Sequence, residues 1–236
     1  PPFIMSTKLN RAKRLPKWLK VKLPRNRKFF QLKSLVAKYK LNTVCESASC
    51  PNIGTCWDAG TLTFMILGDT CSRACRFCDV DTGNMLAPNA DEPAQIAETL
   101  SKLNLRYAVI TSVDRDDLID GGAEHWVKTI QLVRTQCPQM KIETLIPDFQ
   151  GKMNLVEKIC AAQPDVLAHN LETVESLQNR LRPQCRYAWS LDTLATAAAR
   201  KNLIVKSSLM LGLGEKEEEV IRTMKDLLDA GCQILS

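Results

Sequence analysis

Residues 61–78 read TLTFMILGDTCSRACRFC, a short apolar run followed at once by three closely spaced cysteines. The run over residues 62–67 has the length and composition of a β-strand that is buried on both faces. The cysteines then lie in the loop after the carboxyl end of that strand. Because reactive residues of parallel α/β proteins gather at the carboxyl ends of strands, this loop is a candidate active site.

The same alternation of apolar strand and amphipathic helix continues along the chain. We expect strands at residues 107–111, 141–146, 166–171 and 203–211, and the opening of a sixth at 233–235. Helices are predicted around 91–103, 126–133 and 215–230, with Gly231 at the C′ position of the last one. Repeated strand–helix units predict an α/β fold with parallel strands, either a barrel or an open doubly wound sheet.

Residues 1–60 lack this alternation, and we expect an N-terminal arm there, with the sheet domain over 61–236. Residues 1–40 hold 13 Lys or Arg and no Asp or Glu, whereas the rest holds 19 basic and 26 acidic residues. Such an arm is either a solvated tail, a remnant of an organelle transit peptide, or a docking site for an acidic partner. No apolar run approaches the roughly 20 residues of a membrane span, and no secretory signal is evident.

Cys71, Cys75 and Cys78 have the spacing C-x-x-x-C-x-x-C, which gathers three thiols in one loop. A structural zinc site or an electron-transfer [4Fe–4S] cluster takes four ligands, so three leave one metal position open for a substrate or cofactor. A thioredoxin-like role for Cys75 and Cys78 would ignore Cys71.

Cys45, Cys50 and Cys56 form a second triplet upstream. Zinc is the ordinary explanation of one such triplet, but two triplets within 34 residues favour iron–sulfur clusters. The other four of the ten cysteines are scattered singly and are expected to be small buried hydrophobic residues.

The three-cysteine loop, with Phe77 before its last cysteine, resembles the radical S-adenosylmethionine (SAM) superfamily. Together with the upstream segment CESASCPN (45–52), it resembles the lipoyl synthase family in particular. Four further segments match that family: AGTLTFMILG (59–68), ITSVDRDDL (110–118), ETLIPDF (143–149) and HNLET (169–173).

The resemblance implies a partial parallel (β/α)6-type radical SAM barrel with an N-terminal arm, its sixth strand cut short at residue 236. It also implies two [4Fe–4S] clusters, one on Cys71, Cys75 and Cys78 that binds SAM, and an auxiliary one on Cys45, Cys50 and Cys56. Contacts to SAM are expected at the strand ends, from Phe77, Thr111, Ser112, Glu143, Asn170, Glu172, Lys206, Ser208 and Leu211.

The implied reaction is the insertion of two sulfur atoms, at C6 and C8, into an octanoyl chain, with the auxiliary cluster as sulfur source. The implied partners are an octanoylated lipoyl-carrier protein or domain, which the basic arm would bind through Arg25, Arg27 and Lys28, and an electron donor such as ferredoxin or flavodoxin. No nucleic acid or membrane partner is expected. The expected location is the bacterial cytoplasm, or an organellar matrix in a eukaryote.

The family's sequences continue with a C-terminal Arg-Ser-Ser-Tyr-His motif that supplies a serine ligand to the auxiliary cluster. This sequence ends at Ser236 without that motif, so the fourth ligand has no assignment. Two alternatives stay open: another radical SAM enzyme whose auxiliary cluster is not consumed, and a basic binding module stabilised by zinc or a cluster.

Overall fold

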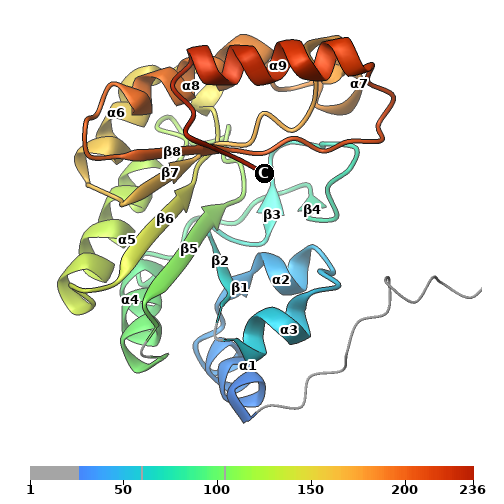
Figure 1. Ribbon diagram of the computed structural model, residues 1–236. Helices are drawn as coiled ribbons and strands as arrows, with labels where there is room; N and C mark the ends of the chain where they lie inside the picture. The colour runs from blue at the N-terminus through green and yellow to red at the C-terminus, as the bar shows by residue number, and fades with distance from the viewer. Residues whose placement is uncertain (1–26, 60, 104) are drawn as a thin grey trace, which may run out of the picture.

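The computed structural model describes residues 27–59, 61–103 and 105–236. Within the first range, only the backbone of Lys28 is described. Most of the predicted basic arm, residues 1–26 with Arg25, therefore lies outside the described residues. The described chain is built around one mixed sheet with helices packed along it (Figure 1).

The sheet contains six parallel strands in the order in which they occur in the chain. These strands are β2 (Thr63–Ile66), β5 (Tyr107–Ser112), β6 (Lys141–Leu145), β7 (Val166–Ala168), β8 (Ile204–Ser207) and β9 (Ile234–Leu235). Each lies within or closely overlaps a predicted strand, so the prediction of a parallel α/β fold is confirmed. The spatial order never reverses, whereas a doubly wound sheet reverses at its switch point. The strand order therefore matches the barrel alternative, although the described sheet does not close, because β1 and β9 are its edges.

Strand register separates two faces of the sheet. One row runs through Phe64, Ile110, Thr144, Leu167 and Val205, all of them completely buried. Because side chains alternate along a strand, the next row, with Thr111 and Lys206, belongs to the opposite face. This second face, which we call the inner face, also carries Glu143, and three of the predicted polar contacts lie on it.

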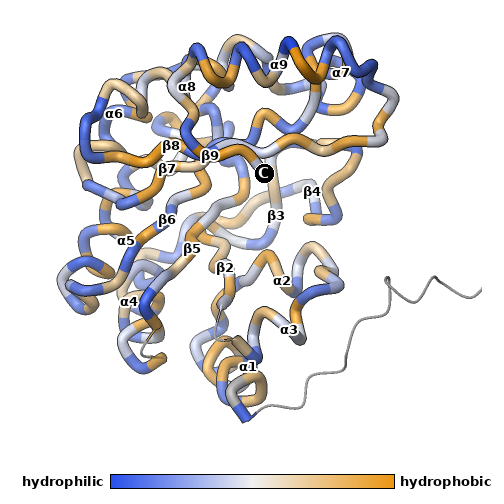
Figure 2. The backbone as a smooth tube through the Cα atoms, in the orientation of Figure 1, coloured by the Kyte–Doolittle hydropathy of each residue, from blue (hydrophilic) through white to orange (hydrophobic). Residues whose placement is uncertain are grey.

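The crossover segments between successive strands are helical. They include α4 (Glu92–Leu103), α5 (Ala123–Gln136), α6 (Met153–Ala161), α7 (Glu175–Leu181), α8 (Tyr187–Ala198) and α9 (Glu217–Asp229). Figure 2 shows apolar stretches on the strands of the main sheet, interrupted by some polar residues, and helices that alternate between polar and apolar residues. Apolar positions of α4 and α5, such as Ile96, Trp126 and Ile130, are fully buried in the same core as the strands, whereas Met224 and Leu228 of α9 are 48% and 70% exposed. The predicted helices at 91–103, 126–133 and 215–230 are confirmed.

The described part of the N-terminal segment packs onto this core. It contains α1 (Arg27–Tyr39), β1 (Asn42–Thr43), α2 (Val44–Ser47) and α3 (Ile53–Asp58). β1 adds to the sheet antiparallel to β2, and Trp57 of α3 is completely buried with its ring 5.4 Å from that of Phe29. The sequence predicted a wrapped arm but none of these helices and strands. Within the described residues, no helix is both long and apolar enough to cross a membrane.

Candidate active site

The three-cysteine loop (residues 71–78) lies beyond the carboxyl end of β2, as the sequence predicts. A two-stranded parallel ladder of β3 (Thr70–Cys71) and β4 (Asp81–Thr82) brackets it, so both ends of the loop are fixed. The Sγ atom of Cys71 accepts hydrogen bonds from the backbone N–H groups of Arg73, at 3.4 Å, and Asp114, at 3.3 Å. Cys71 and Cys75 are half-buried and Cys78 is exposed.

Arg73, inside this loop, has one of the most buried charged side chains of the site. Its guanidinium forms a bidentate pair with Asp116, at 2.7 and 2.9 Å, and a second one with Asp148, at 2.7 and 3.0 Å. Asp114 lies 3.5 Å away and Cys185 accepts a further hydrogen bond at 3.2 Å. The loop is thereby joined to the segments that follow β5 and β6.

Several pKa values in this region depart from their ordinary range. Burial, followed by the nearby charge of Asp114, raises the pKa of the Cys71 thiol to about 11. Burial also raises the pKa of Asp114 to about 6, although Arg73 opposes the shift. Burial alone would raise the pKa of Asp148, but the hydrogen bonds and charge of Arg73, with the charge of His169, together lower it. A metal that binds Cys71 must therefore displace a firmly held proton.

Cys185 differs from the small buried hydrophobic residue that the sequence predicted. It is buried, but it is hydrogen-bonded to Cys75 and receives an N–H from Arg73. The hydrogen bond from Cys75, then the charges of Arg182 and Arg73, lower the pKa of Cys185 to about 7. The same hydrogen bond raises the pKa of Cys75. Of the other scattered cysteines, Cys160 is buried, while Cys137 and Cys232 are half-buried.

The upstream triplet comes from α2, the following turn and α3. Its three thiols are free and half-buried. Burial, then the charges of Cys45 and Cys50, raise the pKa of Cys56, so the three sulfurs are close enough to interact electrostatically. The backbone closes the segment on itself, with Cys50 N–H donating to the Cys45 carbonyl oxygen at 3.1 Å.

The donor sets fit iron–sulfur clusters in their chemistry. Each triplet is a compact run of free thiols, and Cys71 already receives two backbone hydrogen bonds of the kind that tune cluster sulfurs. Among the described residues, however, no three Cys, His, Asp or Glu side chains converge in the geometry of a metal site. Ligation by either triplet is therefore a proposal.

Three of the expected SAM contacts share the inner face. Lys206 Nζ donates to Glu143 Oε1 at 2.8 Å, and the Tyr107 hydroxyl also donates to Glu143. Glu143 was expected at a strand end, but it lies inside β6, two residues before the end, and is 5% exposed. A buried carboxylate needs such partners. Thr111 lies on the same face and donates to the Leu145 carbonyl oxygen at 2.9 Å.

Ser112 is separated from these residues, because alternation along β5 turns it to the helix-covered face. Its hydroxyl is buried and has no hydrogen-bond partner in the described structure. Neighbouring positions on one strand thus do not both reach the inner face.

The remaining expected contacts follow the strands. Asn170 and Glu172 come after β7, where Glu172 is hydrogen-bonded to Asn170 and its pKa is raised by burial. Ser208 follows β8, and its carbonyl oxygen accepts the Glu172 N–H at 3.0 Å. Leu211 is 68% exposed and Phe77 is half-buried, so both are open to a ligand.

The two histidines are held by hydrogen bonds within the fold. His169 Nδ1 lies 2.8 Å from the Ile146 carbonyl oxygen, and its Nε2 lies 2.9 Å from the Ser190 hydroxyl. His125 Nε2 lies 2.7 Å from Glu92. The sequence assigned neither as a metal ligand, and both side chains have structural partners.

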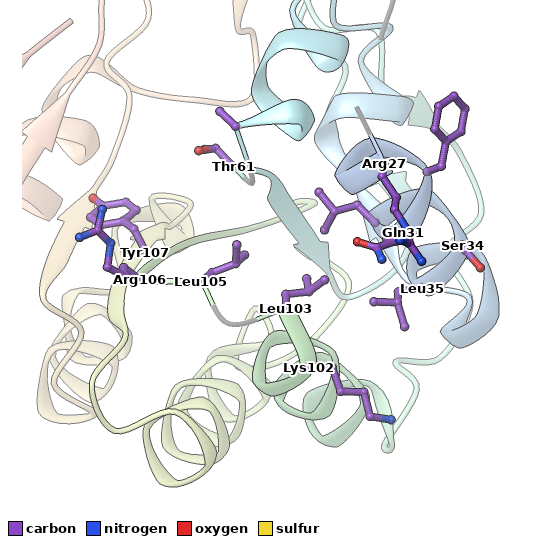
Figure 3. A pocket seen from close by; sticks show the side chains of 13 residues that line it. Arg27, Gln31, Ser34, Leu35, Thr61, Lys102, Leu103, Leu105, Arg106 and Tyr107 are labelled. Carbon is purple, nitrogen blue, oxygen red and sulfur yellow. The ribbon is translucent and has the colours of Figure 1, made fainter. Parts of the chain in front are cut away.

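A cavity of about 1000 Å³ lies at the other end of the sheet, between α1 and the starts of β2 and β5 (Figure 3). Arg27, Gln31 and Leu35 of α1 line one side of it, and Leu103 and Tyr107 line another. Because it lies at the amino ends of the strands and contains none of the six cysteines or the expected SAM contacts, it does not belong to this site, although Arg27, which was expected to bind the carrier protein, lines it.

Comparison with known proteins agrees with this geometry. The family model described as the radical SAM superfamily matches residues 65–227, and that for the N-terminal domain of lipoyl synthase matches residues 4–50. The lipoyl synthase of Flavobacterium psychrophilum is 51% identical over 94% of this chain and 76% of its own length. The mitochondrial lipoyl synthase of Nematostella vectensis is 48% identical over 94% of this chain and 76% of its own.

Solved structures share the fold at low identity. Methylornithine synthase (PylB) superposes with a TM-score of 0.58 at 14% identity, over 89% of this chain and 64% of that one. HydG, a maturase of the [FeFe]-hydrogenase, gives 0.56 at 11% identity, over 71% and 38%.

Strand-end cysteines on a parallel sheet, with a superfamily match over most of the chain, define a radical SAM enzyme. Within that superfamily, the chain belongs to the lipoyl synthase family. Membership implies the use of SAM and of one [4Fe–4S] cluster, and a lipoyl-carrier protein as substrate.

Proposed function

We propose that this enzyme inserts two sulfur atoms, at C6 and C8, into an octanoyl chain that is bound to a lipoyl-carrier protein. The observation that carries the proposal is the three-cysteine loop, which follows β2 and is fixed by hydrogen bonds to Asp114, Asp116 and Asp148, residues that follow β5 and β6. A second free-thiol triplet on α2 and α3 supports two clusters rather than one.

Cys71, Cys75 and Cys78 would hold the SAM-binding [4Fe–4S] cluster, and Cys45, Cys50 and Cys56 the auxiliary cluster. When bound, the first cluster supplies the electron for cleavage of SAM, from a donor such as ferredoxin or flavodoxin, and the second supplies the sulfur. Three thiols leave the open coordination position that a bound cofactor needs.

The chain's own side chains would bind and orient SAM. Lys206, Glu143 and Thr111 offer an ammonium, a carboxylate and a hydroxyl on one face, which suit an amino acid or a ribose. Asn170, Glu172, Ser208, Leu211 and Phe77 would surround the rest of the cofactor, and Ser112 would contribute only through the backbone. Burial of the inner face would exclude water from the reactive intermediate.

Iron and sulfide analysis of protein purified without oxygen tests the two-cluster proposal. We expect about eight irons per chain in the parent, and about four in the Cys71/Cys75/Cys78→Ala and Cys45/Cys50/Cys56→Ala variants. A Cys137/Cys160/Cys232→Ala variant is the matched control and should keep about eight. Zinc in place of iron would contradict the proposal and favour a metal-stabilised binding module.

Turnover separates the proposed reaction from that of another radical SAM enzyme. With an octanoylated carrier domain, the Cys45/Cys50/Cys56→Ala variant should still cleave SAM but form no product that carries sulfur at C6 and C8. A variant without the upstream triplet that still makes lipoyl product would show that the sulfur comes from elsewhere. An auxiliary cluster that survives turnover would favour the alternative enzyme.

A further inference from the structure

Arg73 has every one of its donors occupied, although it lies in a loop between two proposed cluster ligands. Nε–H and one Nη2–H bind Asp116, the other Nη2–H and one Nη1–H bind Asp148, and the remaining Nη1–H reaches Cys185. An arginine side chain has five N–H groups, so none is left free. The side chain is 1% exposed, which makes it unavailable to a ligand or to solvent.

We propose that Arg73 is a positioning residue, which locks the three-cysteine loop onto the ends of β5 and β6 and so sets where its sulfurs stand. The inference rests on the proposed ligation of a cluster by this loop. It adds a residue to the site that donates no ligand atom.

A chain of hydrogen bonds connects Arg73 to the sulfur of Cys71 through the segment that follows β5. Arg73 holds Asp116, whose backbone N–H donates to the Ser72 hydroxyl at 3.0 Å. Ser72 N–H in turn donates to the Asp114 carbonyl oxygen at 3.0 Å, and Asp114 N–H donates to Cys71 Sγ at 3.3 Å. The hydrogen bond to the sulfur thus depends on the contact between the two loops.

Arg73 is also connected to Cys75, through Cys185. Arg73 holds Asp148, a residue that is 1% exposed and also accepts the Gln150 N–H at 2.9 Å. Cys185, the last partner of the guanidinium, is hydrogen-bonded to Cys75. Arg73 therefore contacts, directly or through one residue, the surroundings of two of the three proposed ligands.

A lysine cannot replace this arginine. Two carboxylates are each held by two parallel N–H groups, and only the planar guanidinium presents donors in that geometry. An ammonium in the same place would keep the charge but leave carboxylate oxygens without partners in a buried site. The consequence should be a loop that holds its cluster less firmly, in a sheet that is otherwise intact.

The test uses a Cys45/Cys50/Cys56→Ala background, so that only the cluster of the three-cysteine loop is observed. Arg73→Lys is compared with Arg76→Lys, a matched control because Arg76 lies in the same loop, is exposed, and has no side-chain partner in the described structure. Three quantities are measured: iron release to an iron(II) chelator, the electron paramagnetic resonance spectrum of the dithionite-reduced cluster with and without SAM, and the melting temperature of metal-free protein.

We expect Arg73→Lys to release iron at least tenfold faster than the background and to shift or broaden the spectrum, with a metal-free melting temperature close to that of Arg76→Lys. Asp116→Asn should act in the same direction, and Asp116→Asn combined with Arg73→Lys should add little, because both changes break one interaction. Arg76→Lys should match the background.

Equal iron release and identical spectra for Arg73→Lys and Arg76→Lys would overturn the inference. It would also be overturned if Arg73→Lys lowered the metal-free melting temperature strongly while Asp116→Asn kept iron at the background rate, because Arg73 would then only stabilise the fold. A background protein that takes up no iron would refute the proposed function, and the inference with it; the first two results leave the proposed function standing.

Discussion

Single buried residues of this protein are held in one protonation state by their neighbours. His169 shows this most simply, because one ring nitrogen faces a carbonyl oxygen and the other faces a hydroxyl. The carbonyl oxygen can only accept, so Nδ1 carries the proton and Nε2 accepts from Ser190. Burial, then repulsion from Arg182, lowers the pKa of His169 from 6.5 to about 4.

This shift predicts a pH dependence of stability. The unfolded chain protonates its imidazole near pH 6.5 and the folded chain only near pH 4, so the free energy of unfolding falls as the pH is lowered between these values. We compare metal-free parent and His169→Asn by urea denaturation. On going down to pH 4, the free energy of unfolding of the variant should fall by about 3 kcal/mol less than that of the parent. The comparison of slopes is independent of any constant loss of stability, and parallel curves for parent and variant would contradict the shift.

At the residue scale, the cysteines were predictable and their neighbours were not. The two triplets follow from local spacing, and the carboxyl-end position of the loop follows from the strand before it. Arg73, by contrast, lies 43 residues from Asp116 and 75 from Asp148, and only the packing of β5 and β6 brings them together. The opposite facing of Thr111 and Ser112, and the position of Glu143 inside β6, also depended on strand bounds that the sequence located only roughly.

At the scale of elements, the end of α9 shows how completely local sequence can specify structure. Gly231 has φ +82, and its N–H donates to the Leu228 carbonyl oxygen at 2.9 Å. Cys232 N–H donates to the Leu227 carbonyl oxygen, also at 2.9 Å. These two bonds form a Schellman motif, and the predicted C′ glycine is confirmed.

The glycine is required for a second reason, because a Cβ at position 231 would lie 2.5 Å from the Cβ of Ala198 in α8. Gly231→Ala should therefore reduce the free energy of unfolding by about 2 kcal/mol, through the left-handed backbone and the clash together. In an Ala198→Gly background, Gly231→Ala should reduce the free energy of unfolding by less, because the clash with the Ala198 Cβ is then absent; chemical denaturation measures the difference. A loss that this second change leaves untouched would mean that the backbone conformation alone matters.

Three long periodic helices were predicted, whereas α1 and α8, of 13 and 12 residues, were missed together with the short elements. The helices α4, α5 and α9 have 12 to 14 residues and clear apolar faces, which the sequence displays directly. β1 has two residues and α2 has four, too few for any periodicity to be visible. Their conformation is set by pairing with β2 and by the surrounding core, which are tertiary effects.

At the scale of the whole molecule, the described N-terminal residues and the sheet share one core. Phe29, Leu32 and Val36 of α1 belong to the same buried cluster as Trp57 and as Phe64 of β2. β1 also extends the main sheet. A single core predicts a single cooperative unfolding transition for both parts of the chain, even though the upstream triplet and the three-cysteine loop belong to different segments.

Two single-tryptophan reporters can test this unity. One variant replaces Trp18, Trp126 and Trp189 by Phe and keeps only Trp57, in α3. The other replaces Trp18, Trp57 and Trp189 by Phe and keeps only Trp126, in α5. In metal-free protein, the urea transition seen by either fluorophore should coincide with the loss of the far-ultraviolet circular dichroism of the same variant. Phe29→Ala should then lower the free energy of unfolding by about 3 kcal/mol for the Trp57 and the Trp126 reporter alike. An earlier transition at Trp57, or a Phe29→Ala effect confined to it, would instead mean that residues 27–59 unfold as a separate unit, and that the two proposed clusters are carried by parts that can move independently.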